Sequence, residues 1–235
     1  MDKSRFPNFY RLSIKDRVKA VYKRGLISKE DYLALKNQQQ QLDLHSADKM
    51  IENVIGVMGL PIGLGLNFLI NGKDYVIPLA VEEPSIVAAL SSAAKIFRNH
   101  GGLKAESGDP ILIGQIQVVN INNLEKARSE IMSGKEKILN LANSFHPRMV
   151  ARGGGAVDLN VKTYPMSSFA QDMLIIDLHV DTRDAMGANL VNGMCEGIAS
   201  LIESITEGEV FLRILSNLSD KALASASVII PKDAL

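Results

Sequence analysis

The stretch that decides the fold of this chain is Met173-Leu-Ile-Ile-Asp-Leu-His-Val-Asp181, which runs directly into Thr182-Arg-Asp-Ala-Met-Gly-Ala-Asn189. The first part is an apolar run of strand length, and it predicts a buried β-strand. The second part opens the segment 185–206, in which apolar residues recur at helical spacing. We therefore expect a strand that passes through a short turn into a long helix.

The neighbouring segments continue these two kinds of pattern. We expect three further strands and one further helix, the strands at 111–121, 156–163 and 210–218 and the helix at 123–143. The order β-α-β-β-α-β is that of the ferredoxin-like fold, in which two helices cover one face of an antiparallel sheet. The sequence thus predicts an α+β protein with a small ferredoxin-like domain at 110–218.

The segment before this domain has a different organisation. Helical spacing at 47–57 leads into a glycine-rich loop that includes Gly63 and Gly65. The turn Asn71-Gly72 between two apolar runs predicts a β-hairpin, because these residues accept the positive φ values of a tight turn. A helix is expected to begin at Pro84, whose missing N–H group is not needed in a first turn.

Domain boundaries follow from composition. Residues 105–110 have the composition of a linker, and the four glutamines at 38–41 indicate a helix end or an exposed connection. We expect 1–109 to form the first part of one domain, to which 219–235 return after the small domain.

Composition and charge narrow the class of protein. The chain has 235 residues, of which 46% are hydrophobic, enough for a well-buried core. Its 26 basic and 26 acidic side chains cancel, so overall charge gives no reason to expect nucleic acid or an anionic membrane as a partner. A single cysteine, Cys195, and the lack of a signal-like apolar segment favour a soluble, cytoplasmic protein.

The adjacent carboxylates of Val81-Glu-Glu-Pro-Ser85 form the first candidate site. With Pro84 at the first helical position, Glu83 becomes the N-cap of the following helix. The helix end lowers the pKa of a capping carboxylate, whereas burial beside Glu82 raises it. This pattern is compatible with a catalytic carboxylate and also with a solvent-exposed helix cap.

The turn Asp184-Ala-Met-Gly-Ala-Asn189 is the second candidate. Backbone N–H groups near Met186 and Gly187 at a helix start can face an anion such as a dinucleotide pyrophosphate, but an ordinary Asp-capped helix has the same pattern. Farther along this helix, Gly193 and Gly197 form a smooth ridge, which is more often a site of close packing than of chemistry.

Three weaker signals remain. Arg152-Gly-Gly-Gly155 is either a phosphate-binding loop or a flexible connection, and Asn217 either binds a ligand at a strand end or caps a turn. The four histidines, including His146, have no spacing typical of metal ligands, so we expect no metal site.

Four segments together resemble 3-hydroxy-3-methylglutaryl-coenzyme A (HMG-CoA) reductase of the bacterial class II. They are Glu52-Asn-Val-Ile-Gly56, Val81-Glu-Glu-Pro-Ser-Ile-Val-Ala-Ala89, Arg183-Asp-Ala-Met-Gly-Ala-Asn189 and Arg213-Ile-Leu-Ser-Asn-Leu218. The resemblance covers nearly the whole chain. It implies a large substrate domain, here 1–109 and 219–235, and two hydride transfers from NADPH or NADH that convert HMG-CoA to mevalonate and coenzyme A, or the reverse.

The resemblance also implies a role for particular residues. Glu83 matches a catalytic acid that donates a proton to the carbonyl oxygen of the substrate, which requires burial that raises its pKa. Substrate-binding positions are matched by Ser85 and Asn217, and cofactor-binding positions by Asp184, Met186, Gly187 and Asn189. The segment at 52–56 matches the dimer interface, and a homodimer is implied because the family forms its active sites between subunits.

Two departures from the family pattern carry expectations of their own. Where NADH-preferring relatives place an aspartate, this chain has His146 followed by Arg148 and Arg152, which suits the 2′-phosphate of NADPH. The family also continues past Leu235 into a segment with a catalytic lysine, aspartate and histidine. We expect either the first portion of a reductase completed by another chain or segment, or an inactive fragment that keeps nucleotide-binding and dimerisation surfaces.

Overall fold

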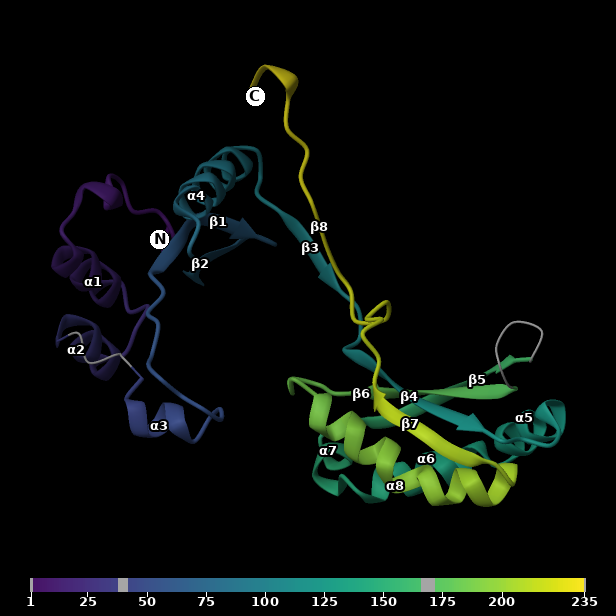
Figure 1. Cartoon of the computed structure of the whole chain (residues 1–235). Helices are drawn as coiled ribbons and strands as arrows, with labels where there is room; N and C mark the ends of the chain where they lie inside the picture. The colour runs from purple at the N-terminus through teal and green to yellow at the C-terminus, as the bar shows by residue number, and fades with distance from the viewer. Residues whose placement is uncertain (1, 38–41, 166–171, 235) are drawn as a thin grey trace. The chain divides into compact units, whose positions relative to one another are not determined.

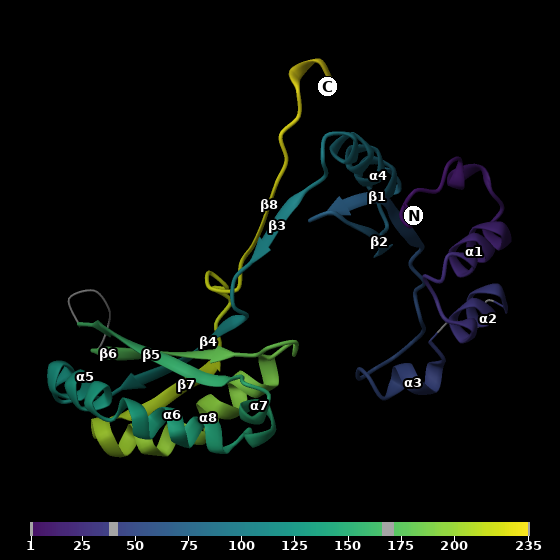
Figure 2. The same ribbon diagram turned by 180° about the vertical axis from the view of Figure 1, so that it is seen from behind.

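A computed structural model of the chain describes residues 2–37, 42–165 and 172–234, so the glutamines at 38–41 lie outside it (Figure 1). The chain forms two compact units, one of residues 1–105 with 226–235 and one of residues 106–225. Strands β3 (Lys104–Ser107) and β8 (Ala224–Ser227) pair where the chain passes from one unit to the other, and both views show them side by side (Figures 1 and 2).

The unit 106–225 is a four-stranded antiparallel sheet covered on one face by helices (Figure 1). Its strands, in spatial order, are β5 (Gly155–Tyr164), β6 (Met173–Asp181), β4 (Ile111–Val119) and β7 (Glu209–Leu215). Its helices are α5 (Leu124–Ser133), α6 (Lys135–Ser144), α7 (Pro147–Ala151) and α8 (Ala188–Thr206). The predicted β-α-β-β-α-β order and the α+β class are confirmed.

Alternation along the strands builds the core of this unit. On β6, every second side chain from Leu174 to Val180 is fully buried against the helices. On α8, buried side chains recur at helical spacing and pack against the same sheet; they are Val191, Met194, Cys195, Ile198 and Ile202. Burial of this apolar surface is the main stabilising contribution to the unit.

Helix α8 approaches strand β4 at a glycine. A Cβ atom added to Gly114 would collide with Sγ of Cys195 and lie 2.8 Å from Cγ1 of Val191. Only a residue without a side chain therefore lets the helix lie this close to the strand.

Two helix boundaries differ from the prediction. The segment 123–143 is not one helix but two, because the chain breaks at Gly134, which ends α5 and begins α6. Helix α8 begins at Ala188 rather than 185, because Gly187 has a φ of 90°, outside the helical region.

The described residues of the unit formed by 1–105 and 226–235 contain helices of up to 16 residues and one hairpin. Its elements are η1 (Phe9–Arg11), α1 (Ile14–Lys23), α2 (Lys29–Asn37), α3 (Leu44–Asp48), β1 (Ile62–Ile70), β2 (Lys73–Ala80), α4 (Pro84–Asn99) and η2 (Lys232–Ala234). The predicted hairpin is confirmed, since β1 and β2 pair through Asn71-Gly72, both at positive φ. Gly63 and Gly65 lie within β1 and not in a loop, and a Cβ at Gly63 would lie 3.0 Å from Val87 of α4.

The expected helix at 47–57 is wrong. Helix α3 spans only Leu44–Asp48, and Asn53 takes a left-handed φ of 59°. The apolar side chains that suggested a helix lie in solvent, with Ile51 67% and Ile55 104% exposed. A short amphipathic helix depends on packing of its apolar face, which the described residues do not supply here.

An ionic cluster joins the N-terminal segment to the hairpin and α4. Arg98 donates to Oδ1 of Asp74 over 2.5 Å and to Oδ1 of Asp2 over 3.0 Å. The fully buried Ser4 donates from Oγ to the same Asp74 oxygen. Arg98 and then Ser4 hold the pKa of Asp74 at about 2, below its ordinary value of 3.8.

We predict that Arg98→Met destabilises the protein by about 2 kcal/mol, because it leaves a largely buried carboxylate without its charged partner. Urea unfolding at neutral pH measures the change. Arg128→Met, which removes an exposed guanidinium paired with Glu125 over 3.9 Å, is the matched control and should cost no more than about 0.5 kcal/mol.

The same cluster predicts a pH dependence. Because the pKa of Asp74 is lowered on folding, its contribution to stability is complete above pH 3.8 and is lost as the pH falls towards 2. The difference in unfolding free energy between the wild type and Arg98→Met should shrink across this range. A difference that stayed constant from neutral pH to pH 2 would contradict the prediction.

We further predict that Gly114→Ala destabilises the protein by about 1–3 kcal/mol, because the new methyl group forces α8 away from β4. Adding Cys195→Ala should restore part of the loss by removing one of the colliding atoms. Gly59→Ala is the control, since a Cβ there would meet no atom within 4 Å. Thermal unfolding of the wild type and these three variants tests the prediction.

Candidate active site

A tight turn connects β6 to α8 in the unit 106–225. The N–H of Thr182 donates to Pro110 O over 3.1 Å, and the N–H of Arg183 donates to Oδ1 of the buried Asp181 over 2.9 Å. At the end of the turn, a Cβ on Gly187 would lie 2.5 Å from Cγ2 of Thr182. Both the left-handed φ and this close approach require glycine at the start of α8.

The predicted cofactor-binding side chains surround this helix start. Asp184, Met186 and Asn189 are all exposed, Met186 at 78%. The first turn of a helix carries N–H groups without intrahelical acceptors and the positive end of the helix dipole, so this surface favours an anion.

The loop between α6 and β5 lies against the same helix. The His146 ring lies over Gly193, where its Nε2 would be 2.9 Å from an added Cβ, and the Phe145 ring lies over Gly197. The ridge of glycines on α8 thus accommodates two rings, in keeping with the packing interpretation. It also holds His146 beside the second turn of the helix.

One residue links this loop to the turn. The guanidinium of Arg183 donates through Nε to Gly153 O over 2.9 Å and through Nη2 to the same oxygen. Gly153 follows Arg152, which is exposed at the end of α7. The structure therefore brings the loop that carries His146 and Arg152 together with the turn that carries Asp184.

The end of β7 is held by the polar face of α8. Asn192 accepts from the N–H of Leu215 over 2.8 Å, and Ser216 donates its N–H to Ile113 O over 2.8 Å. Asn217 follows at once and is exposed. Asn217 and Asp184 belong to the same unit, 106–225.

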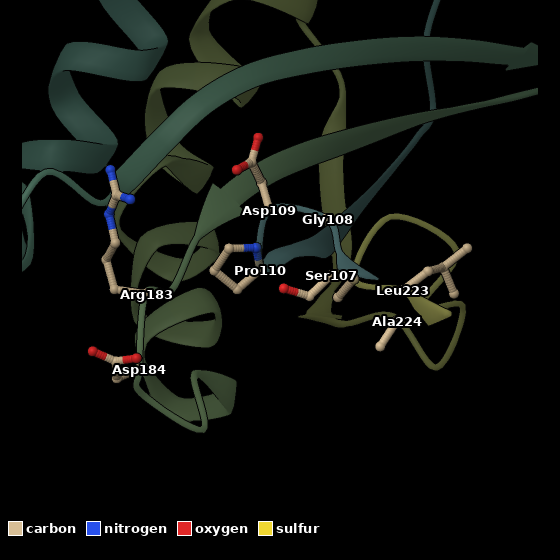
Figure 3. Close-up of a pocket in the computed structure, with 9 residues that line it drawn as sticks. Ser107, Gly108, Asp109, Pro110, Arg183, Asp184, Leu223 and Ala224 are labelled. Atoms are coloured by element: carbon tan, nitrogen blue, oxygen red, sulfur yellow. The ribbon is translucent and has the colours of Figure 1, made fainter. Parts of the chain in front are cut away.

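A cavity of about 520 Å³ lies next to the turn (Figure 3). It is lined by 107–110 and 222–224 together with Arg183 and Asp184. Asp109 is a lining residue that the sequence did not indicate, because the Gly-Asp-Pro composition around it is that of a linker. The carbonyl of Pro110 that accepts from Thr182 fixes these residues beside the helix start.

The other predicted site residues lie in the unit 1–105. Glu83 is the N-cap of α4, and its Oε1 accepts from Ser85 Oγ over 2.8 Å and from Ser85 N over 3.5 Å. Both residues are exposed. The predicted cap geometry is therefore present, but the described residues do not provide the burial that a catalytic acid requires.

Two further properties concern the described residues 2–37, 42–165 and 172–234. Within them, no group of three or more His, Cys, Asp or Glu side chains could hold a metal ion. No helix in the same ranges is long and apolar enough to cross a bilayer.

Comparisons with known proteins agree with one another. The model of the family "Hydroxymethylglutaryl-coenzyme A reductase" matches residues 13–235. The 3-hydroxy-3-methylglutaryl-coenzyme A reductase of Archaeoglobus fulgidus is 46% identical over 232 residues, which are 99% of this chain and 52% of that protein. A probable reductase of Borreliella burgdorferi is 36% identical over 181 residues, or 77% of this chain and 40% of its own length.

Solved structures of HMG-CoA reductases also match this chain. A Streptococcus pneumoniae HMG-CoA reductase superposes with a TM-score of 0.89 at 36% identity, covering 96% of this chain and 53% of that one. A class II reductase structure from the same organism, bound to NADPH in open conformations, matches equally well and is covered to 60%. The chain spans about half the length of the curated relatives it matches. It belongs to the hydroxymethylglutaryl-coenzyme A reductase family.

Proposed function

We propose that this chain supplies the cofactor-binding domain and the catalytic Glu83 of a reductase that converts HMG-CoA to mevalonate and coenzyme A with two NADPH. One observation carries the proposal: Arg183, the neighbour of Asp184, donates to Gly153 O and so ties the segment of His146 and Arg152 to the turn of Asp184. The family match over 13–235 supports it. The match spans only part of each relative, so the activity of the whole protein is likewise something that we propose.

The surface at the start of α8 fits a dinucleotide. An added Cβ would lie 2.5 Å from Cγ2 of Thr182 at Gly187 and 2.7 Å from Asp181 O at Gly154, so glycine at both places lets the turn and the neighbouring segment pack closely at the end of β6. The helix start favours a pyrophosphate. Asp184, Met186, Gly187 and Asn189 would hold the cofactor here, and the bound cofactor supplies the hydride.

The loop 146–155 favours NADPH over NADH. It contains His146, Arg148 and Arg152 and no acidic residue, and the His146 ring lies against Gly193 of α8. Guanidinium groups bind phosphate oxygens through charge-assisted hydrogen bonds, whereas an aspartate at the same place would repel the phosphate. We therefore assign the 2′-phosphate to His146 and Arg152.

Glu83 is proposed to donate a proton to the substrate carbonyl, and Ser85 and Asn217 to bind the substrate. The hydroxyl of Ser85 already donates to Glu83 Oε1 over 2.8 Å, which orients the carboxyl group. A carboxyl that is to stay protonated needs a dry environment, which the substrate and further protein surface would supply. The remaining groups of the reaction would come from outside residues 1–235.

The proposed partner in the assembly is a second copy of the chain, in the cytoplasm. The segment 52–56 is exposed except for the half-buried Val54, and it is flanked by the exposed apolar side chains of Ile51, Met58 and Leu60, which is the character of an interface. This surface supports a homodimer whose subunits share active sites.

Oxidation of NADPH with HMG-CoA by the native protein that carries this chain tests the proposal. Glu83→Gln should lower kcat by at least about 100-fold, because the amide cannot donate the proton, while the Kd for NADPH stays the same. Glu82→Gln, the adjacent exposed carboxylate, is the control and should keep its activity. NADPH binding without turnover in the wild type would instead support a nucleotide-binding fragment.

The choice of cofactor has its own test. Arg152→Met should reduce the preference for NADPH over NADH by about tenfold, because one charge-assisted hydrogen bond to the 2′-phosphate is lost. Fluorescence titration with each reduced cofactor measures the two Kd values. Arg128→Met, on the exposed face of α5, should leave the ratio unchanged, and an equal ratio in all three proteins would refute the assignment.

A further inference from the structure

We propose that Arg183 is a positioning residue for the cofactor: its guanidinium holds the loop 146–155 at a fixed distance from the turn 182–187. The inference rests on the proposed function, since it assumes that both segments bind one dinucleotide. It adds a residue to which neither the motif nor the family resemblance assigns a role.

The backbone of Arg183 is committed to this arrangement. Its φ of 49° lies in the left-handed region, which an arginine rarely adopts, and its N–H donates to Oδ1 of Asp181 over 2.9 Å. Asp181 is buried, and its other oxygen lies 3.6 Å from Nε of Arg183. The left-handed turn therefore sends the arginine side chain in a direction fixed by a buried carboxylate.

Figure 3 shows that Arg183 and Asp184 point in different directions from consecutive positions. Both residues line the cavity beside the helix start, and the Arg183 guanidinium ends on Gly153 O, to which both Nε and Nη2 donate. A single carbonyl thus receives two donors of one rigid planar group, which restrains the loop more than a single flexible donor would.

The rest of the segment 146–155 is held by the hydrogen bonds of α7, by the buried Met149 and by the pairing of Gly155 with Asp181. The N–H of Gly154 donates to Met149 O over 3.1 Å within the end of α7, and the His146 ring rests on Gly193 at the other end. Between these points Arg152 and Gly153 are exposed. Arg183 is consequently the side-chain contact that reaches this exposed part from the turn among the described residues.

The test compares Arg183→Met and Arg183→Lys in the native protein. Both replacements place an unbranched side chain at the left-handed φ, so their backbone cost is matched. Arg183→Met should raise the Kd for NADPH about tenfold and speed hydrogen exchange of the amides at 150–155, while kcat at saturating NADPH stays within about twofold. Arg183→Lys, which can still donate to Gly153 O but only as a single flexible donor, should recover part of the affinity.

Three results would overturn the inference. The first is an unchanged Kd for NADPH in Arg183→Met. The second is a raised Kd with unchanged hydrogen exchange at 150–155, which would mean that Arg183 contacts the cofactor directly. The third is a Kd in Arg183→Lys that is no lower than in Arg183→Met. Arg128→Met is the control for loss of an exposed charge in the same unit. Failure of the proposed function is recognised separately, because the wild type would then not bind NADPH.

Discussion

The close contact between α8 and β4 at Gly114 is the constraint on which the unit 106–225 depends. Once Cys195 lies against that glycine, the position of the whole helix is set. Its first turn then faces the end of β6, Gly193 lies under the His146 ring, and Asn192 reaches the backbone of Leu215. A packing requirement in the core thus determines where three separate parts of the candidate site lie.

Local patterns predicted the elements whose stability comes from one well-packed face. The strands of this unit alternate because helices cover only one side of the sheet, so their period is visible in the sequence. The break at Gly134 was missed because a single glycine is tolerated within helices. The prediction of a helix at 47–57 is wrong for the opposite reason. Its apolar spacing is helical, but no described surface packs against Ile51 and Ile55.

In the candidate site too, local sequence predicts some features, and others depend on contacts between distant segments. The residues from Asp184 to Asn189 are consecutive in the chain, so their sequence was enough to place them together at a helix start, which the structure has at Ala188. The contact of Arg183 with Gly153 joins residues 30 positions apart, and nothing in either segment encodes the pairing. The exposure of Glu83 was equally invisible, since burial of a cap depends on which surfaces meet it rather than on its own sequence.

The pairing of β3 with β8 affects how the unit 106–225 is inserted into the rest of the chain. The chain enters and leaves the unit 106–225 through neighbouring strands, with the N–H of Gly108 donating to Leu223 O over 2.9 Å. An insertion whose two ends are held together costs its host little more entropy than a short surface loop. The unit 106–225 can therefore vary in sequence, or be exchanged as a whole, with little entropic cost to the rest of the chain.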